Sequence, residues 1–173
     1  MAVSMDFEKL VSGYYGALYH FAFSLTRDEA DSCDLVQQTF CIWARKGHQL
    51  RDPAKVKTWL FTTLHREFLS ARRHQTRFTH IELAGADAEL PVVPPATVNQ
   101  LDTAQVLAAL AQLDEIFRAP VALFYLQDCS YNEIAEILEV PLGTVKSRLT
   151  RGLGRLQETL TARKIEAQKP NNL

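Results

Sequence analysis

Residues 126–151 read LQDCSYNEIAEILEVPLGTVKSRLTR and form the most informative part of the sequence. Ser130 and Glu133 have the spacing of a capping box, which predicts that a short helix begins there. The Glu-Val-Pro-Leu-Gly sequence that follows predicts a tight turn, and a second helix is predicted to start at Thr144. Two helices joined by such a turn are typical of a helix-turn-helix unit.

The second helix of this unit has an apolar side and a basic side. Apolar residues from Val145 to Leu160 fall on one side when successive residues are placed about 100° apart. The other side carries short polar and long basic side chains, which can bind the edges of bases or DNA phosphates. The predicted contacts with duplex DNA are Thr144, Lys146, Ser147, Arg148 and Arg151.

The charges of the chain are gathered in blocks. The 173 residues include 19 Lys and Arg and 20 Asp and Glu, so the net charge of −1 alone argues against binding to nucleic acid. Residues 45–77, however, contain nine Lys and Arg and two acidic residues, and residues 144–173 contain seven and two. Because salt screens charges beyond ~8–10 Å, the two basic blocks predict two contacts with phosphates.

The N-terminal part of the chain is predicted to be helical over residues 6–25, 28–46 and 54–74. Aromatic and basic residues are interleaved in the third of these helices. Unpaired bases can stack on aromatic rings while basic side chains bind the backbone, so this helix is a candidate for binding single-stranded nucleic acid. The same rings could instead form the core of the unit, and both interpretations remain open.

Residues 76–103 separate the two helical parts. They contain three prolines and little periodicity, and a loop of this length is unusual inside a compact domain. Further helices are predicted over residues 106–113 and 120–126. The sequence thus predicts an all-α protein of two small helical domains joined by a flexible linker, the C-terminal domain being a helix-turn-helix. The predicted boundaries are 1–75 and 104–164 for the domains, 76–103 for the linker and 165–173 for a tail.

The sequence offers little support for an enzyme. Its histidines and cysteines lack the spacing of metal ligands, and it has no glycine-rich phosphate loop or nucleophile elbow. We therefore expect no catalytic residues, no metal and no other cofactor. Three cysteines without a CxxC pair, no apolar run near the ~18 residues of a membrane span, and no signal peptide predict a cytoplasmic protein without membrane insertion.

Three segments of the chain resemble a known family. Residues 126–151 resemble region four of bacterial sigma factors of the extracytoplasmic-function (ECF) class, in particular through the Ser-Tyr-Asn-Glu-Ile-Ala and Gly-Thr-Val-Lys-Ser-Arg motifs. Residues 34–43 are similar to the region-two helix that docks on the polymerase clamp. Residues 59–73 are similar to the segment that melts promoter DNA. The resemblance covers nearly the whole chain, in the same order.

The resemblance implies a function for each segment. The chain would direct core RNA polymerase to promoters, and its partners would be the polymerase, promoter DNA as duplex and melted strand, and a regulator such as an anti-sigma factor. The implied polymerase contacts are Asp34, Gln37, Gln38, Phe40 and Trp43. The implied contacts with the melted minus-ten element are Trp59, His65, Arg66, Arg72 and Arg73. The predicted duplex contacts of the helix-turn-helix would then read the minus-thirty-five element.

The chain departs from the family pattern at several positions. The family commonly has Glu at the position of Gln38, Asn at that of Arg66 and Asp at that of Ser70. The last two fall in the melting segment, so the resemblance does not fix the base preference at the minus-ten element.

Two other functions are compatible with these observations. A stand-alone helix-turn-helix regulator would bind duplex DNA without polymerase. A sigma mimic would bind an anti-sigma factor and would not need basic residues for reading DNA, whereas this chain has Lys146, Arg148 and Arg151.

Overall fold

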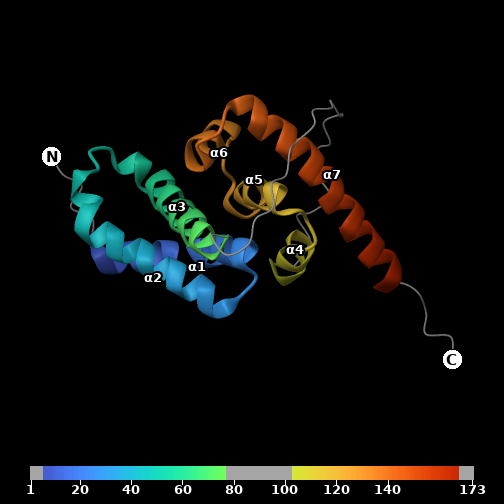
Figure 1. Ribbon diagram of the computed structural model, residues 1–173, viewed down its shortest axis with the longest axis horizontal. Coiled ribbons are helices and arrows are strands. Elements are labelled where there is room, and N and C mark those ends of the chain that lie inside the picture. The colour runs from blue at the N-terminus through green and yellow to red at the C-terminus, as the bar shows by residue number, and fades with distance from the viewer. Residues whose placement is uncertain (1–5, 77–102, 168–173) are drawn as a thin grey trace.

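The computed structural model describes residues 6–76 and 103–167 and shows an all-α fold (Figure 1). In these residues the chain forms seven α-helices and two short 3-10 helices and no strand, as the sequence predicts. The α-helices are α1 (Phe7–Thr26), α2 (Glu29–Lys46), α3 (Val56–Thr76), α4 (Thr103–Leu110), α5 (Glu115–Gln127), α6 (Tyr131–Leu138) and α7 (Leu142–Ala167). The 3-10 helices are η1 (Gly47–Gln49) and η2 (Pro53–Lys55). The predicted linker, apart from its two end residues, and residues 168–173 of the predicted tail lie outside the described residues.

Helices α1, α2 and α3 form the N-terminal unit. Asp6 and Asp28 cap α1 and α2, since each carboxylate accepts a hydrogen bond from a backbone N–H of the first turn. The core of the unit is aromatic, with the rings of Phe21 and Phe61 5.4 Å apart and both side chains fully buried. Its three helices begin and end within two residues of the predicted positions, because caps and periodicity are local signals.

Helices α4 to α7 form the C-terminal unit, and here two predicted helices have different bounds. The helix expected over residues 106–113 is α4, which lies three residues earlier, at Thr103–Leu110. A helix was expected to begin at Pro120, whereas α5 begins at Glu115 and includes Pro120 as a buried residue. A proline inside a helix forfeits one backbone hydrogen bond. The helix continues because the next turn places Val121, Ala122 and Leu123 in the core, with no exposed surface, and this burial outweighs the loss.

The two units pack against each other. Helix α1 lies against α5, and α3 lies against α6 (Figure 1). Gln127 of α5 donates a hydrogen bond from Nε2 to the carbonyl of Ala17 in α1, at 3.2 Å. Arg118 of α5 is buried and donates to the carbonyls of Leu113 and Leu25, at 2.9 and 3.4 Å. The sequence does not predict this contact, because its partners lie up to 110 residues apart.

We predict that a Gly152→Ala substitution destabilises the protein by about 1–3 kcal/mol. Helix α7 passes so close to α5 at this point that a Cβ atom on Gly152 would lie 2.5 Å from Val121 Cγ2 and 3.1 Å from Phe117 Cβ. Urea unfolding followed by circular dichroism measures the effect. The control is Gly154→Ala, where a Cβ atom meets nothing within 4 Å and alanine should stabilise the helix by up to about 1 kcal/mol. Equal effects of the two substitutions would contradict the close approach.

Candidate nucleic-acid interface

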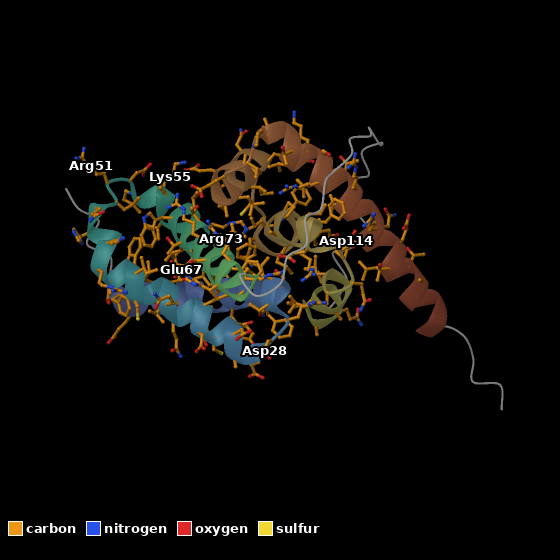
Figure 2. All side chains as sticks on the ribbon, in the orientation of Figure 1. Asp28, Arg51, Lys55, Glu67, Arg73 and Asp114 are labelled. Carbon is orange, nitrogen blue, oxygen red and sulfur yellow. The ribbon has the colours of Figure 1, made fainter. Side chains whose placement is uncertain are left out.

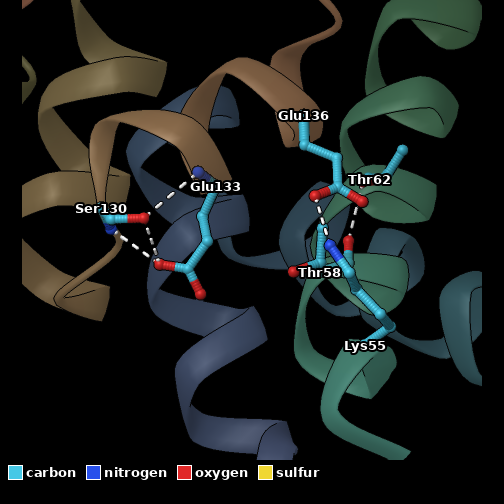
Figure 3. A network of polar contacts seen from close by, with 6 residues as sticks. All are labelled: Lys55, Thr58, Thr62, Ser130, Glu133 and Glu136. Atoms are coloured by element: carbon cyan, nitrogen blue, oxygen red, sulfur yellow. Dashed lines mark hydrogen bonds and ion pairs between the residues drawn. The ribbon is translucent and has the colours of Figure 1, made fainter. Parts of the chain in front are cut away.

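The helix-turn-helix begins at a complete capping box, shown in Figure 3. Ser130 N donates to Glu133 Oε2 at 2.8 Å, and Glu133 N donates to Ser130 Oγ at 3.3 Å. These hydrogen bonds to Ser130 hold the pKa of the Glu133 carboxyl below its usual value, because they stabilise the charged form. The predicted cap is therefore confirmed, and it fixes where α6 begins relative to α5.

The turn after α6 places a charged residue in an unusual backbone conformation. Glu139 ends the helix with φ of 55°, in the left-handed region that favours glycine. Arg27 and Asp128 end α1 and α5 in the same way, with φ of 58° and 49°. Each of these residues closes its helix with a hydrogen bond from its own N–H to a carbonyl of the last turn.

Helix α7 has the two predicted faces. Val145, Leu149 and Leu156 are buried at 0–1% exposure against the rest of the C-terminal unit. Of the predicted duplex contacts, Lys146 is exposed, and the half-buried ones are Thr144, Ser147, Arg148 and Arg151. Because α7 begins at Leu142, these residues lie in its first three turns. The arrangement suits the binding of DNA phosphates and base edges.

The aromatic residues of α3 belong mainly to the core. Phe61 and Phe68 are buried, and Trp59 is half-buried with its ring 5.0 Å from that of Trp43 in a T-shaped arrangement. The core interpretation of these rings is thus confirmed for Phe61 and Phe68. Trp59 keeps part of its surface accessible.

The basic residues of α3 and of η2 before it face acidic residues of the C-terminal unit. Lys55 Nζ lies 2.7 Å from Glu136 Oε2 (Figure 3). Arg66 contacts Glu139 with two nitrogens, at 3.1 and 2.5 Å.

Near the end of α3, Arg72 NH1 lies 2.6 Å from Glu115 Oε1, and Arg73 is exposed. The ion pairs of Lys55 and Arg66 also shift pKa values. The pKa of the Glu139 carboxyl is lowered by the Arg66 guanidinium, and the pKa of Lys55 is raised by Glu136.

His65 lies in the same contact. Burial lowers the pKa of its imidazole from 6.5 to about 4, because the charged form loses its hydration. The Glu139 carboxylate acts in the opposite direction, and the Arg148 guanidinium of α7 in the same direction. His65 is therefore neutral at pH 7, and the charges of Glu139 and Arg148 in the C-terminal unit act on it.

The predicted polymerase-binding residues lie on α2. Asp34, Gln37 and Gln38 are exposed, whereas Phe40 and Trp43 are only 6% exposed and belong to the core of the N-terminal unit. Asp34 and Gln38 line a cavity of about 750 Å³ whose wall also includes residues of α3 and the buried Arg118. The exposed carboxylate and amides are accessible to a partner, and the two rings support the helix that carries them.

Other kinds of site find no support in the described part of the chain. No group of three or more histidine, cysteine or acidic side chains in it could hold a metal ion. None of its helices is long and apolar enough to cross a membrane.

Sequence reasoning missed the acidic side of the contact with α3. Glu115 lies on α5, Glu136 lies on α6 and Glu139 directly follows α6, and the sequence assigns no role to any of them. The sequence assigns no specific contact to Lys55 or Lys57. In the structure, Lys57 Nζ donates a hydrogen bond to the carbonyl of Gln127 at 2.5 Å. No local signal identifies these partners: Glu136 lies 81 residues from Lys55, Glu139 lies 73 residues from Arg66, and the carbonyl of Gln127 lies 70 residues from Lys57.

We predict that His65 makes the folded protein less stable in acid. In an unfolded chain this imidazole binds a proton near pH 6.5, but in the folded chain only near pH 4. Between these values the unfolded state holds more protons, so the free energy of unfolding falls with decreasing pH, by about 3 kcal/mol in total. Urea unfolding of the protein and of a His65→Gln variant, from pH 7 to pH 4, measures this. The variant should lose this part of the pH dependence; parallel curves would contradict the burial of a neutral His65.

Comparison with known proteins agrees with this geometry. The family Sigma-70 region 2 matches residues 10–78, and the family Sigma-70, region 4 matches residues 103–156. The ECF RNA polymerase sigma factor SigM of Bacillus subtilis is 30% identical over 156 residues, which cover 88% of this chain and 94% of that protein. The ECF sigma factor SigL of Mycobacterium tuberculosis is 32% identical over 154 residues, which cover 87% and 86%.

A solved structure is also similar. The sigma factor RpoE of Bartonella quintana, in complex with the anti-sigma factor NepR, superposes with a TM-score of 0.70 and 32% identity over 90% of this chain and 97% of that chain. The regions match in the order in which the N-terminal and C-terminal units occur here. The chain belongs to the ECF class of RNA polymerase sigma factors.

Proposed function

We propose that this sigma factor directs core RNA polymerase to promoters with two DNA-binding surfaces, one on each unit. The observation that carries the proposal is the basic face of α7, which follows a complete capping box and is held by a buried apolar face. Thr144, Lys146, Ser147, Arg148 and Arg151 would contact the minus-thirty-five element in the major groove. The arginines would bind guanine edges or phosphates with two hydrogen bonds each.

The second surface would bind the melted minus-ten element. Trp59 offers a partly accessible ring for stacking, and Arg73 is exposed at the end of α3. Arg66 and Arg72 would join them once they leave their acidic partners, and His65 once it is uncovered. Single-stranded DNA is bound by this combination of rings and basic side chains.

The polymerase would dock on α2. Asp34, Gln37 and Gln38 supply exposed polar groups for this contact, and Phe40 and Trp43 hold the helix in place from the core. Because the rings are buried, their replacement would act through the fold, whereas replacement of the exposed residues would act on the contact itself.

We further propose a division of the chain into a region-two domain (1–75), a linker (76–103), a region-four domain (104–164) and a tail (165–173). The protein would act in the cytoplasm, without a cofactor and without catalytic residues of its own, since the polymerase performs the chemistry. An anti-sigma factor is the expected regulator, because the similar RpoE is bound to the anti-sigma factor NepR.

One experiment separates this function from a stand-alone regulator and from a sigma mimic. The protein is mixed with bacterial core RNA polymerase and a library of promoter fragments, and run-off transcripts are sequenced. A sigma factor yields transcripts that share promoter elements. Duplex binding without polymerase would favour the regulator, and binding to an anti-sigma factor without initiation would favour the mimic.

We predict that Arg148→Ala reduces initiation from the selected promoters without weakening binding to core polymerase. A base contact by arginine is worth about 1–3 kcal/mol, which corresponds to a loss of roughly five- to 150-fold in run-off transcription. Lys9→Ala, which removes an exposed basic residue from α1, is the control and should leave transcription unchanged. A similar loss in both variants would argue against a specific role of the α7 face.

We predict that Asp34→Arg weakens binding to core polymerase by at least about tenfold, as expected for a charge reversed inside an interface. Asp34 is exposed, so the variant should keep its unfolding temperature. Binding is measured by fluorescence anisotropy of the labelled sigma factor. Glu8→Arg reverses an exposed charge on α1 and is the matched control; equal affinity of the two variants would show that α2 is not the docking helix.

A further inference from the structure

We propose that a cavity between α2, α3 and α5 binds a small molecule through its phosphate group, which Arg27, Arg72 and Arg118 would hold. The cavity has a volume of about 750 Å³, within the usual range of ligand sites. Its wall is formed by the corner between α1 and α2, by α2 itself, by the second half of α3 and by Arg118 of α5. Such a ligand is an addition to the proposed function and does not depend on it.

Arg118 is a buried charge without an ionic partner among the described residues. Its side chain is 7% exposed. Nε donates to the carbonyl of Leu113 at 2.9 Å, and Nη1 donates to that of Leu25 at 3.4 Å. The ion pairs within the described ranges do not include Arg118. Because buried charges are normally paired with opposite charges, two neutral carbonyls leave the environment of this guanidinium incomplete, and an anion would complete it.

One nitrogen of Arg118 remains available to a ligand. Nη2 forms no hydrogen bond with any residue that the structure describes. The same residues contain no fully buried side-chain nitrogen or oxygen without a partner, so Nη2 is accessible to water. Since Arg118 lines the cavity, we infer that Nη2 is accessible from there, and its two N–H groups can donate to an anionic oxygen.

Two further guanidinium groups lie near Arg118. Arg27, which ends α1, is exposed and lines the cavity, as does Arg72 of α3. Burial lowers the pKa of the Arg118 guanidinium, and the positive charges of Arg27 and Arg72 lower it further, whereas Glu115 and Asp114 raise it. An anion that binds among the three arginines would reduce their mutual repulsion.

The charges around Arg118 favour phosphate over carboxylate. Glu115 forms an ion pair with Arg72 and compensates one of the three arginines, while Asp114 forms an ion pair with Arg155. About two positive charges therefore remain for a ligand. A phosphate monoester carries a charge of about −1.5 to −2 at pH 7 and three strong acceptor oxygens, whereas a carboxylate carries a single charge on two oxygens.

The carboxylates that line the cavity affect Arg118 less. Asp31 and Asp34 belong to α2, and Glu67 belongs to α3, where Figure 2 labels it. None of the three is among the charged groups that act most strongly on the pKa of Arg118. A phosphate is therefore expected next to Arg118, and hydroxyl groups of the same molecule can donate to the carboxylates. A sugar phosphate has both kinds of group.

The test measures binding of ribose 5-phosphate to the full chain by isothermal titration calorimetry. We expect a dissociation constant of about 1 mM or lower, and no binding of ribose, which lacks the phosphate. In the Arg27→Gln variant the affinity should fall at least about tenfold, as expected for the loss of a charged hydrogen-bond donor. The matched control is Arg51→Gln, since Arg51 is exposed and lies at the other end of the N-terminal unit (Figure 2); this variant should keep the affinity.

Three results would overturn the proposal. The first is no binding of ribose 5-phosphate at roughly 10 mM. The second is equal binding of ribose, which would show that the phosphate is not recognised. The third is equal affinity of the Arg27→Gln and Arg51→Gln variants, which would place the bound phosphate elsewhere on the protein.

A substitution at Arg118 tests the buried side of the site. Arg118→Lys keeps the positive charge but removes the Nη2 donors, so the affinity should fall at least about tenfold. A folded variant with unchanged affinity would overturn the proposal. The substitution also removes the hydrogen bonds to Leu113 and Leu25, and circular dichroism shows whether the variant folds. If it does not fold, the exposed Arg27 decides the test.

Nucleic acid carries phosphates as well, and a second titration separates this source from a small molecule. A single-stranded DNA of roughly 20 nucleotides is added to the Arg27→Gln and Arg51→Gln variants. We expect equal affinities, because neither residue belongs to the proposed DNA-binding surfaces. If Arg27→Gln weakened DNA binding as much as it weakened binding of ribose 5-phosphate, the arginines would serve nucleic acid and the proposal would be wrong. Run-off transcription tests the proposed function separately.

Discussion

Helix α3 has to keep one face apolar and another face basic, and the arrangement of the two units follows from this constraint. Its apolar face, which includes Leu60, Phe61 and Leu64, is completely buried against α1 and α2. Its basic face cannot enter a core, because buried charges need partners. In the structure, the C-terminal unit supplies these partners through glutamates at the surface.

The net charge of −1 is partly explained by ion pairs between the two units. The basic and acidic residues are not only nearly equal in number. Three acidic residues of the C-terminal unit lie within 3 Å of three basic residues of the N-terminal unit. Basic residues paired in this way attract nucleic acid less strongly than the same residues without their carboxylates.

The features of the structure that depend on neighbouring residues can be predicted from the sequence. The Ser130 cap, the two faces of α7 and the bounds of α1 to α3 follow from spacing and periodicity within one or two turns, and they were predicted correctly. The start of α5 was not, because the burial of residues after Pro120 overrides the local penalty of a proline. The charged groups that act on His65 and the partner of Arg66 are more than 70 positions away in the sequence, and no periodicity reveals such pairs. The roles of individual residues at the DNA remain predictions.

Glu139 shows how two requirements compete at one position. Its left-handed backbone conformation would be adopted more easily by glycine, which has no Cβ to cause strain. Glycine, however, would leave Arg66 without its carboxylate. The chain therefore accepts a less favourable helix end at the turn of its DNA-reading motif. In return, the turn carries a carboxylate that pairs with Arg66 of the N-terminal unit, so a substitution at this one position would alter both a helix end and the contact between the units.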